Sequence, residues 1–366
     1  HPREPYATGR NVKRSPFYER EVELGGYFME LGGWERAHGY KANEHLLEKY
    51  GDRVPVRENE WDNRHFWRVS NAEHLAMSED CGIVNLSHFH MVDIEGPDHV
   101  ELLEWLCAAK IGGDANIGKG IYTHFLDDEG MVRADFTVFR MADRCRLVNG
   151  ADAGPRDFHY MKRVAEDRGL DVTITDVSEK FVTIGIWGPN ARTTLKKVVA
   201  DPAGLDPENF PFAAIKPISI AGKEVTAFRI SYVGEQGWEL HMRYEDGLAV
   251  WDALRSTGVM AFGVETYANS RRMEKSLRLQ NADLLTEYNL FEADLARPKV
   301  KEADFRGKAK HLEYKARAHQ PAMLCTLVMT DNVDSKGVAR YPVGTMPVMD
   351  PATGETLIDE LGRRSF

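Results

Sequence analysis

One short pattern occurs twice in this chain: a strand-like apolar stretch, a Gly-Pro pair and then an amphipathic segment. Gly96-Pro97 follows the stretch 88–94, and Gly188-Pro189 follows the stretch 182–187. Proline is favoured in the first turn of a helix, where its missing N–H is not needed. After each pair, apolar residues recur at helical spacing. The pattern therefore predicts two related α+β units, in the manner of an internal duplication.

Further strand candidates follow each Gly-Pro pair. Short apolar runs bounded by turn residues are typical of strands. The predicted elements are strands at 122–126, 135–140, 145–148 and 225–233, an acidic turn at 127–130, and a helix at 248–254 with Val250, Trp251 and Leu254 on its buried face. Shorter strands at 323–329 and 344–349 suggest the beginning of a small barrel that stops early.

These elements divide the 366 residues into four parts, since a chain of this length exceeds a usual single domain. Residues 1–56 are polar and turn-rich, and we interpret them as an extended arm that packs on a larger body. The predicted bounds are 1–56 for this N-terminal arm, 57–178 and 179–318 for the first and second α+β units, and 319–366 for a partial C-terminal barrel.

Composition excludes several classes of protein. A formal net charge of −10 argues against a nucleic-acid binder, which normally has a basic face. No run of 18 apolar residues is present, so we expect no membrane span. The widely spaced Cys81, Cys107, Cys145 and Cys325 stand in apolar surroundings and suggest buried free thiols. We expect a reducing compartment, the cytoplasm or, in a eukaryote, the mitochondrial matrix.

Two apparent motifs are better explained as ordinary structure. The segment 113–120 is nearly a phosphate-binding loop, but Gly120 stands where Ser or Thr is needed to hold magnesium. His88 and His90 could share one face of a strand, yet no third metal ligand lies at a recognisable spacing. No cysteine or serine lies in a known nucleophile signature. We therefore predict no metal site.

Asp135 is the first candidate for chemistry. It opens the predicted strand 135–140, directly after the acidic turn and beside the apolar Phe136 and Val138. A carboxyl group desolvated by such neighbours has a raised pKa, which suits acid/base or electrostatic roles. The alternative is a solvated turn residue that caps a hairpin. The local residues leave both interpretations open.

The segment 231–240 is the second candidate. It contains two glycines, Gly234 and Gly237, and two carboxylates, Glu235 and Glu239. Glycine lets a backbone approach a flat ligand closely, and a carboxylate held there can accept two parallel N–H bonds. A glycine-rich hairpin with exposed acids would have the same composition, so this alternative also stays open.

In their order and spacing these segments resemble the aminomethyltransferase (glycine-cleavage T-protein) family. The resemblance is stronger to the folate-binding half of dimethylglycine oxidase, dimethylglycine dehydrogenase and sarcosine dehydrogenase. It implies a folate-binding α+β fold with three units around a central channel, the C-terminal β-barrel being incomplete. The segments that carry it are 14–18, 32–36, 132–138, 184–189, 231–240, 272–275, 286–287 and 291–293.

The resemblance also implies a set of site residues. Asp135 matches the aspartate beside the reactive folate nitrogen, and Tyr122 and Thr137 match residues that line the same pocket. Tyr232 matches a tyrosine that contacts the pterin, and Glu239 matches the carboxylate that binds its aminopyrimidine edge. The chain departs from the glycine-cleavage members at 267–269, where Tyr-Ala-Asn replaces an Ala-Arg-Asp run, and this favours the dehydrogenase-type branch.

Three functions follow from the resemblance. The first is transfer of a one-carbon unit from a methylated amine, as an iminium or formaldehyde equivalent, to tetrahydrofolate, giving 5,10-methylene-tetrahydrofolate. Since no glycine-rich dinucleotide motif occurs in this chain, FAD would belong to a separate dehydrogenase domain or subunit. The second is direct O-, S- or N-demethylation, giving 5-methyl-tetrahydrofolate. The third is a folate-binding or scaffolding subunit without catalysis.

Overall fold

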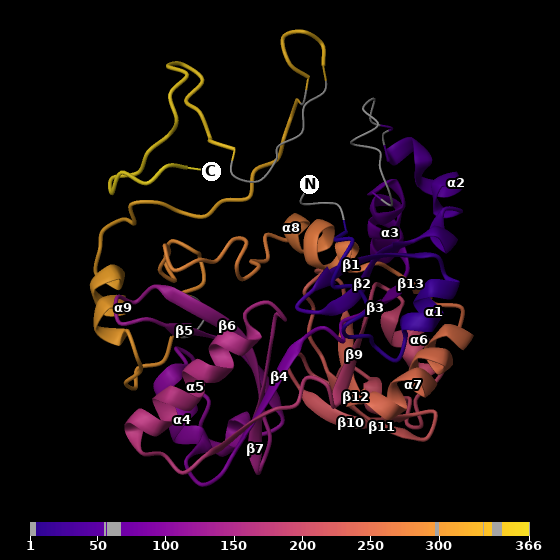
Figure 1. Ribbon diagram of the computed structural model, residues 1–366, viewed down its shortest axis with the longest axis horizontal. Coiled ribbons are helices and arrows are strands. Elements are labelled where there is room, and N and C mark those ends of the chain that lie inside the picture. Colours follow the sequence, from indigo (N-terminus) through magenta and orange to yellow (C-terminus); the bar gives the residue numbers. More distant parts are fainter. Residues whose placement is uncertain are drawn as a thin grey trace.

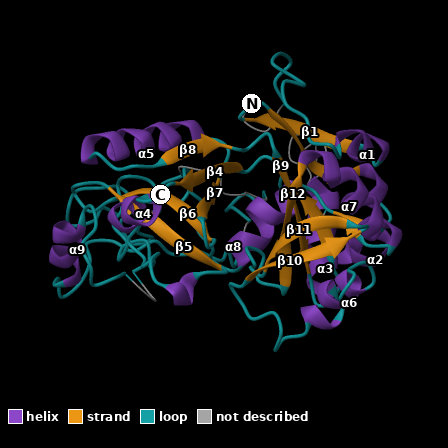
Figure 2. Cartoon of the chain, turned by 90° about the horizontal axis from the view of Figure 1, so that it is seen from below, coloured by secondary structure: helices purple, strands orange, loops and turns teal. Residues whose placement is uncertain are grey.

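The computed structural model describes residues 5–54, 56, 67–296, 300–331, 333–338 and 346–365. Two sheets dominate it, one of five strands and one of six, and they lie side by side (Figure 1 and Figure 2). The short helix α8 (Arg272–Glu274) lies between them in the view of Figure 2. The strands are mostly antiparallel and the helices lie against them, so the predicted α+β class is confirmed.

Both sheets repeat one order of elements, as the Gly-Pro pattern predicts. The first sheet has the order β5-β6-β7-β4-β8, and the second has the order β10-β11-β12-β9-β3-β13. In each sheet, three consecutive strands return to the strand that precedes the Gly-Pro pair. The strands of the first sheet are β4 (His90–Glu95), β5 (Lys119–Leu126), β6 (Val132–Arg140), β7 (Arg144–Asn149) and β8 (Thr173–Asp176); those of the second are β3 (Gly82–Asn85), β9 (Phe181–Trp187), β10 (Ile215–Ile220), β11 (Lys223–Phe228), β12 (Gly237–Arg243) and β13 (Met260–Ala261).

The glycine of each Gly-Pro pair makes a turn that another residue type could not make. Gly96 and Gly188 have φ angles of +105° and +137°. A Cβ atom would lie 2.7 Å from the Asp171 carbonyl oxygen at the first position and 2.1 Å from the Asp80 carbonyl oxygen at the second. Helices α4 (His99–Leu106) and α6 (Ala191–Lys196) begin directly after these turns. The repeated motif is therefore a strand-to-helix turn packed against a neighbouring backbone.

Helices cover one face of each sheet. Ala134, Phe136 and Val138 of β6 lie in one core with α4 and with α5 (Gly154–Arg168). Trp238 and Leu240 of β12 lie in a second core with α7 (Tyr244–Ser256). The remaining short helical turns are Lys41–Asn43, Gly51–Arg53, Asp114–Asn116, Ala203–Leu205 and the π-helical turn Thr266–Arg271. On the opposite face of the second sheet, Val84 of β3 and Trp187 of β9 share a further core with α3 (Trp67–Glu79), so the part of this face near β11 and β12 remains for the site.

One strand crosses between the predicted units. β3 follows α3 (Trp67–Glu79) in the range 57–178, yet it pairs with β9 and β13 of the second sheet. The second sheet therefore contains residues from both sides of the predicted bound at 178. The four predicted ranges remain a prediction about domains.

The N-terminal arm packs on the second sheet, but it is not extended. It contains a hairpin of β1 (Gly26–Leu31) and β2 (Trp34–Tyr40), with helices α1 (Tyr18–Glu23) and α2 (Leu46–Tyr50) on either side. Phe17 stacks on Trp251 of α7 with ring centroids 4.9 Å apart. Because Phe17 is fully buried, the arm is part of the second core.

Glu73 of α3 links this arm to the second sheet. Its carboxylate accepts a hydrogen bond from Asn43 Nδ2 at 2.6 Å and another from the Gly263 backbone N–H at 2.8 Å. Burial raises the pKa of Glu73 from 4.5 to about 7. Since the folded pKa exceeds the unfolded one, the resulting stabilisation is complete below the unfolded pKa and is lost as the pH rises through the folded one.

We therefore expect the free energy of unfolding to fall by up to about 3 kcal/mol as this carboxyl ionises. Glu73→Gln should remove that share of the pH dependence. Part of the pH dependence should remain, because burial also raises the pKa of Glu21 to about 7. Urea unfolding of both proteins at a series of pH values measures the two slopes, and equal slopes would contradict the expectation.

The C-terminal part differs from two predictions. Residues 323–329 form no strand, and the described part of 344–349, from 346 on, contains only an isolated bridge between Met349 and Thr356. Cys325 is exposed, although Cys81, Cys107 and Cys145 are buried free thiols as predicted. The segment follows helix α9 (Lys308–Lys315), and its Leu327 and Val328 are 73% and 84% exposed. Its apolar residues therefore do not form a core of their own.

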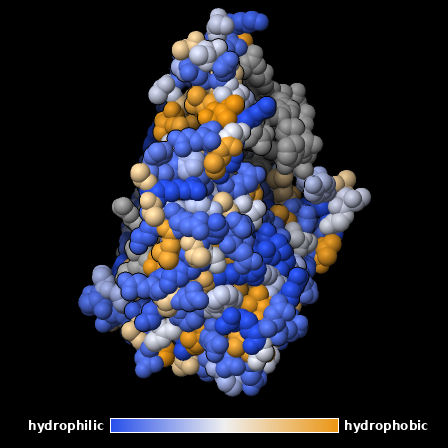
Figure 3. Space-filling view, turned by 90° about the vertical axis from the view of Figure 1, so that its left-hand side faces the viewer, coloured by the Kyte–Doolittle hydropathy of each residue, from blue (hydrophilic) through white to orange (hydrophobic). Residues whose placement is uncertain are grey.

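The surface near α9 is mainly hydrophilic. In Figure 3, which shows the molecule from the left-hand side of Figure 1, hydrophobic side chains form only small groups among polar ones. None of the helices in the described parts of the chain is both long and apolar enough to cross a bilayer.

Candidate functional site

The faces of the two sheets that point away from α4, α5 and α7 meet each other at β6, β11 and β12. Phe139 of β6 contacts Phe228 of β11 and His241 of β12, with ring centroids 4.9 Å apart in both pairs. Successive strand residues point to opposite faces, so every second residue from Phe139 and from His241 points toward the same region between the sheets. Asp135 and Thr137 stand at such positions in β6, and Glu239 does so in β12.

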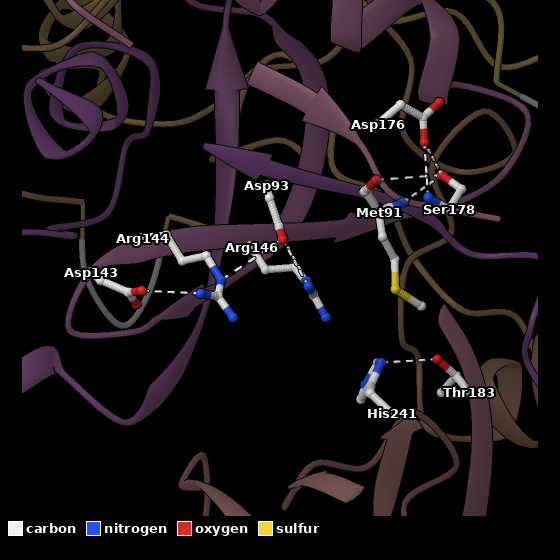
Figure 4. Close-up of polar contacts among 9 residues, drawn as sticks. All are labelled: Met91, Asp93, Asp143, Arg144, Arg146, Asp176, Ser178, Thr183 and His241. Carbon is white, nitrogen blue, oxygen red and sulfur yellow. Dashed lines mark hydrogen bonds and ion pairs between the residues drawn. The ribbon is translucent and has the colours of Figure 1, made fainter. Parts of the chain in front are cut away.

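Residues of β4 and β7 extend the contact between the two sheets. Asp93 and Arg146 form a buried bidentate ion pair on the same face of the first sheet, and His241 Nδ1 and Thr183 Oγ1 lie 2.9 Å apart on the second (Figure 4). The guanidinium of Arg146 stacks on Phe181, the first residue of β9, at 3.8 Å. These contacts hold the two sheets in a defined arrangement.

Asp135 lies in the middle of β6, not at its start as predicted, because the strand begins at Val132. Tyr122 of β5 donates a hydrogen bond from its hydroxyl to Asp135 Oδ2 at 2.9 Å, and Thr137 is the direct cross-strand neighbour of Tyr122. Burial raises the pKa of Asp135 to about 6, although the Tyr122 bond opposes that shift. Asp135 is therefore a desolvated strand residue and not a solvated residue of the turn, and its acid/base role stays a prediction.

Tyr122 combines two properties that rarely occur together. Its side chain is 45% exposed, yet desolvation raises its pKa well above the ordinary value. Asp135 and Tyr232 add to this shift through their charges. A side chain that water reaches but that protein surrounds is typical of a recessed position. The hydroxyl is thus accessible to a ligand.

Glu239 is the buried carboxylate on the opposite sheet. It lies in β12 beside Gly185 of β9, and its Oε2 is 3.3 Å from His241 Nε2. Its Oε1 has no hydrogen-bond partner among the residues that the structure describes. At Gly185 an added Cβ would lie 2.0 Å from the Trp187 ring, so the glycine lets this indole lie flat over the strand. The carboxylate therefore faces the site with one oxygen available.

Glu235, the other carboxylate of the segment 231–240, forms an ion pair with Arg271. Glu235 Oε1 accepts a bond at 2.6 Å from Arg271, whose other terminal nitrogen is 3.0 Å from Glu274. Arg271 is buried in the π-helical turn and fastens the loop 231–237 to it. Of the two carboxylates in this motif, Glu239 is the one left for a ligand.

Tyr232 does not lie on a strand. The predicted strand 225–233 ends at Phe228, and Tyr232 lies in the bend that follows. Its hydroxyl donates to the Arg278 carbonyl, and its ring centroid is 5.2 Å from that of Tyr267. Burial and the charge of Asp135 raise its pKa. Its environment therefore includes the acid on the other sheet.

Tyr267 is a residue of this site that the sequence did not reveal. It stacks on Trp187 at 5.2 Å and contacts Phe89 at 6.4 Å. Its pKa is raised well above the ordinary value by burial and then by the charges of Glu239, Tyr232 and Asp135. It lies in the π-helical turn Thr266–Arg271, a feature often found at functional sites. Tyr267 therefore lies within electrostatic range of both carboxylates. In the sequence, the only indication of its importance was that Tyr-Ala-Asn replaces an Ala-Arg-Asp run at 267–269.

Of the rejected motifs, the segment 113–120 is a loop that leads into β5. His90 lies in β4 with its Nε2 3.2 Å from Asp176, but His88 lies in a turn before that strand, so the two histidines do not share a strand as predicted. The described residues contain no group of three side chains suited to hold a metal. A surface cavity of about 820 Å³ lies against the edge strand β10, but none of the five predicted site residues lines it.

The fold matches that of a solved aminomethyltransferase. The solved glycine cleavage system aminomethyltransferase T of Bartonella henselae superposes with a TM-score of 0.65 at 24% identity, over 83% of this chain and 75% of that one. Residues 17–300 match the family described as the GCVT N-terminal domain. The chain therefore belongs to the GCVT aminomethyltransferase family, and the resemblance drawn from its motifs is confirmed.

Two curated relatives are similar along most of the chain. Dimethylglycine dehydrogenase, mitochondrial, of Rattus norvegicus is 31% identical over 346 residues, which cover 92% of this chain and 38% of the relative. Aminomethyltransferase of Thermotoga maritima is 26% identical over 313 residues, which cover 84% of this chain and 77% of the relative. The chain thus spans less than two fifths of the length of the dehydrogenase.

Proposed function

We propose that this chain binds tetrahydrofolate between its two sheets and transfers to it a one-carbon unit from a methylated amine, giving 5,10-methylene-tetrahydrofolate. One observation carries the proposal. Two carboxylates, Asp135 and Glu239, lie on the sheet faces that meet at Phe139 and His241, and both are near enough to the buried ring of Tyr267 to raise its pKa. A ligand between the sheets would have an acid near each end and aromatic rings beside it.

The residues fit a reduced pterin. A pterin has a ring N–H and an amino group side by side, and a carboxylate accepts such a pair through two parallel bonds. Glu239 has one oxygen without a partner among the described residues, and the other is held only by His241 at 3.3 Å. Tyr232, Tyr267 and Trp187 supply flat surfaces nearby.

Asp135 is the residue we propose for proton transfer. When bound, tetrahydrofolate supplies the nucleophilic nitrogens that accept the one-carbon unit. A carboxyl with a pKa of about 6 is mostly ionised near neutral pH and still basic enough to take the proton that such a nitrogen loses. Tyr122 orients it through the 2.9 Å bond. Thr137, opposite Tyr122 in the sheet, lines the same face.

The source of the one-carbon unit belongs to this proposal as well. One relative is named a dimethylglycine dehydrogenase, and this chain matches only 38% of it. We propose that a flavin-dependent dehydrogenase domain or subunit oxidises the methylated amine, in the cytoplasm or in the mitochondrial matrix of a eukaryote. Direct demethylation of a methyl donor to 5-methyl-tetrahydrofolate is the alternative, and identification of the folate product decides between them.

Glu239→Gln tests the binding half of the proposal. The substitution removes the charge and one of the two acceptors, and hydrogen bonds to charged groups contribute about 1.5–3 kcal/mol, so we expect tetrahydrofolate affinity to fall about tenfold or more. Calorimetric titration measures it. Glu245→Gln is the matched control, because Glu245 lies two residues beyond β12 and its side chain is 69% exposed. If the wild type does not bind reduced folate, the proposal fails; equal affinity in both variants would remove Glu239 from the site.

A further inference from the structure

Arg36 of the β1–β2 hairpin is a desolvated cation without a partner among the residues that the structure describes. It stands opposite Met29 in the hairpin. Its Nε is buried and has no hydrogen-bond partner, and no ion pair within the described parts of the chain includes its guanidinium. Burial lowers its pKa to about 10. An unpaired buried charged group costs free energy unless something completes it.

The side chain lies within electrostatic range of groups that neighbour both halves of the proposed site. Asp152 acts electrostatically on Arg36 and also on Asp135. Glu265, which also acts on Arg36, directly precedes the π-helical turn that contains Tyr267. At the hairpin tip, a Cβ on Gly32 would lie 3.4 Å from the Ala151 side chain. The hairpin therefore reaches from the second sheet to the loop that precedes α5 of the first unit.

The acids around Arg36 are engaged elsewhere. Asp152 Oδ2 accepts a bond from Asn281 Nδ2 at 2.8 Å, and Glu265 Oε2 is 3.3 Å from His38 Nδ1. Glu30 accepts the Gly33 backbone N–H within the hairpin. These acids offset the positive charge at a distance but leave the guanidinium nitrogens open.

We propose that Arg36 binds a carboxylate of a ligand in this site. A guanidinium presents its N–H donors in a planar fork that matches a carboxylate bidentately. Two ligands of the proposed reaction carry this group: the glutamyl part of a folate, and a donor that is an N-methylated amino acid. The choice of these two ligands rests on the proposed function. The unpaired guanidinium itself does not, because it is a feature of the fold.

Paired ligands with and without the carboxylate test the inference. One pair is tetrahydrofolate and the amide of tetrahydropteroate, which has neither the glutamate nor any other carboxylate; the other is N,N-dimethylglycine and its amide, titrated into the folate-loaded protein. We expect the wild type to prefer the carboxylate member of one pair by about tenfold or more. Arg36→Met should abolish that preference, and Arg36→Lys, which keeps the charge without the fork, should retain part of it. The ligand pair whose discrimination is lost in Arg36→Met identifies the ligand that supplies the carboxylate.

Arg243→Met is the matched control, since Arg243 is at the end of β12 with its side chain 72% exposed, and thermal melts of all variants exclude unfolding as the cause. A wild type without preference in either pair, or an Arg36→Met variant that keeps every preference, overturns the inference. If neither reduced pterin binds the wild type, the proposed function fails instead. Binding of both pterins with unchanged discrimination in Arg36→Met refutes only the role of Arg36.

Discussion

Replacement of Asp135 by Asn should lower the rate of folate-dependent one-carbon transfer by about 10²–10⁴-fold, the usual contribution of a general base. Asparagine has nearly the same shape and can still accept the hydrogen bond from the Tyr122 hydroxyl, which is 2.9 Å long in the wild type. It cannot take a proton. Tetrahydrofolate should therefore still bind, because the pterin edge is assigned to Glu239. The rate is measured on the whole assembly that contains this chain, and binding is measured by calorimetry.

The control for this variant is Asp143→Asn. Asp143 lies in the turn between β6 and β7, and its side chain is 71% exposed, so its loss should leave the rate unchanged. A normal rate in Asp135→Asn with intact folate binding would leave only the scaffolding function, in which the chain holds folate without acting on it.

The pH profile gives an independent readout of the same group. The rate should fall as the pH drops below about 6, because the carboxyl is then protonated. The hydrogen bond from Tyr122 lowers the pKa of Asp135. Tyr122→Phe should therefore move this limb of the profile to higher pH. If the acid limb of the profile does not move in Tyr122→Phe, a group other than Asp135 controls the rate at low pH.

The sequence predicts the repeated unit well because its determinants are local. Gly96 and Gly188 each need a positive φ and space for a close backbone contact, and any strand-to-helix turn of this kind leaves that signal. Asp135 and Glu239 could be selected because each lies in a motif with a recognisable order. What joins them is the meeting of the two sheets at Phe139 and His241, a contact between distant segments that has no local signal.

The same reason explains what the sequence did not show. β3 joins the second sheet through pairing with β9, about a hundred residues away, so its place could not follow from its own composition. Tyr267 becomes part of the site only because a π-helical turn points it at Trp187. Cys325 lies beside apolar residues, but burial needs a partner surface, which neighbours in sequence do not provide. Local pattern thus predicts elements, and long-range packing decides which of them meet.

Loss of the Asp93–Arg146 pair should have the largest effect on stability, because it lies where the sheets are held together (Figure 4). The two bonds are 2.6 Å and 2.8 Å long, and both residues are less than 10% exposed, at 8% and 3%. Asp93→Ala leaves Arg146 charged and buried between a strand and the ring of Phe181. Removing one partner of a buried pair costs about 3–5 kcal/mol, and urea unfolding should show a loss of that size.

The double variant Asp93→Leu with Arg146→Met separates a buried-charge effect from a packing effect. If the cost comes from an unpaired charge, apolar residues of similar volume should recover most of the lost free energy, as replacement of buried pairs often does. A double variant no more stable than Asp93→Ala would instead assign the loss to packing. Since Arg146 holds the first residue of β9, and β9 pairs with the strand of Glu239, the recovered variant also reports on the site. Its tetrahydrofolate affinity should fall if the stack on Phe181 is needed to keep Glu239 opposite Asp135.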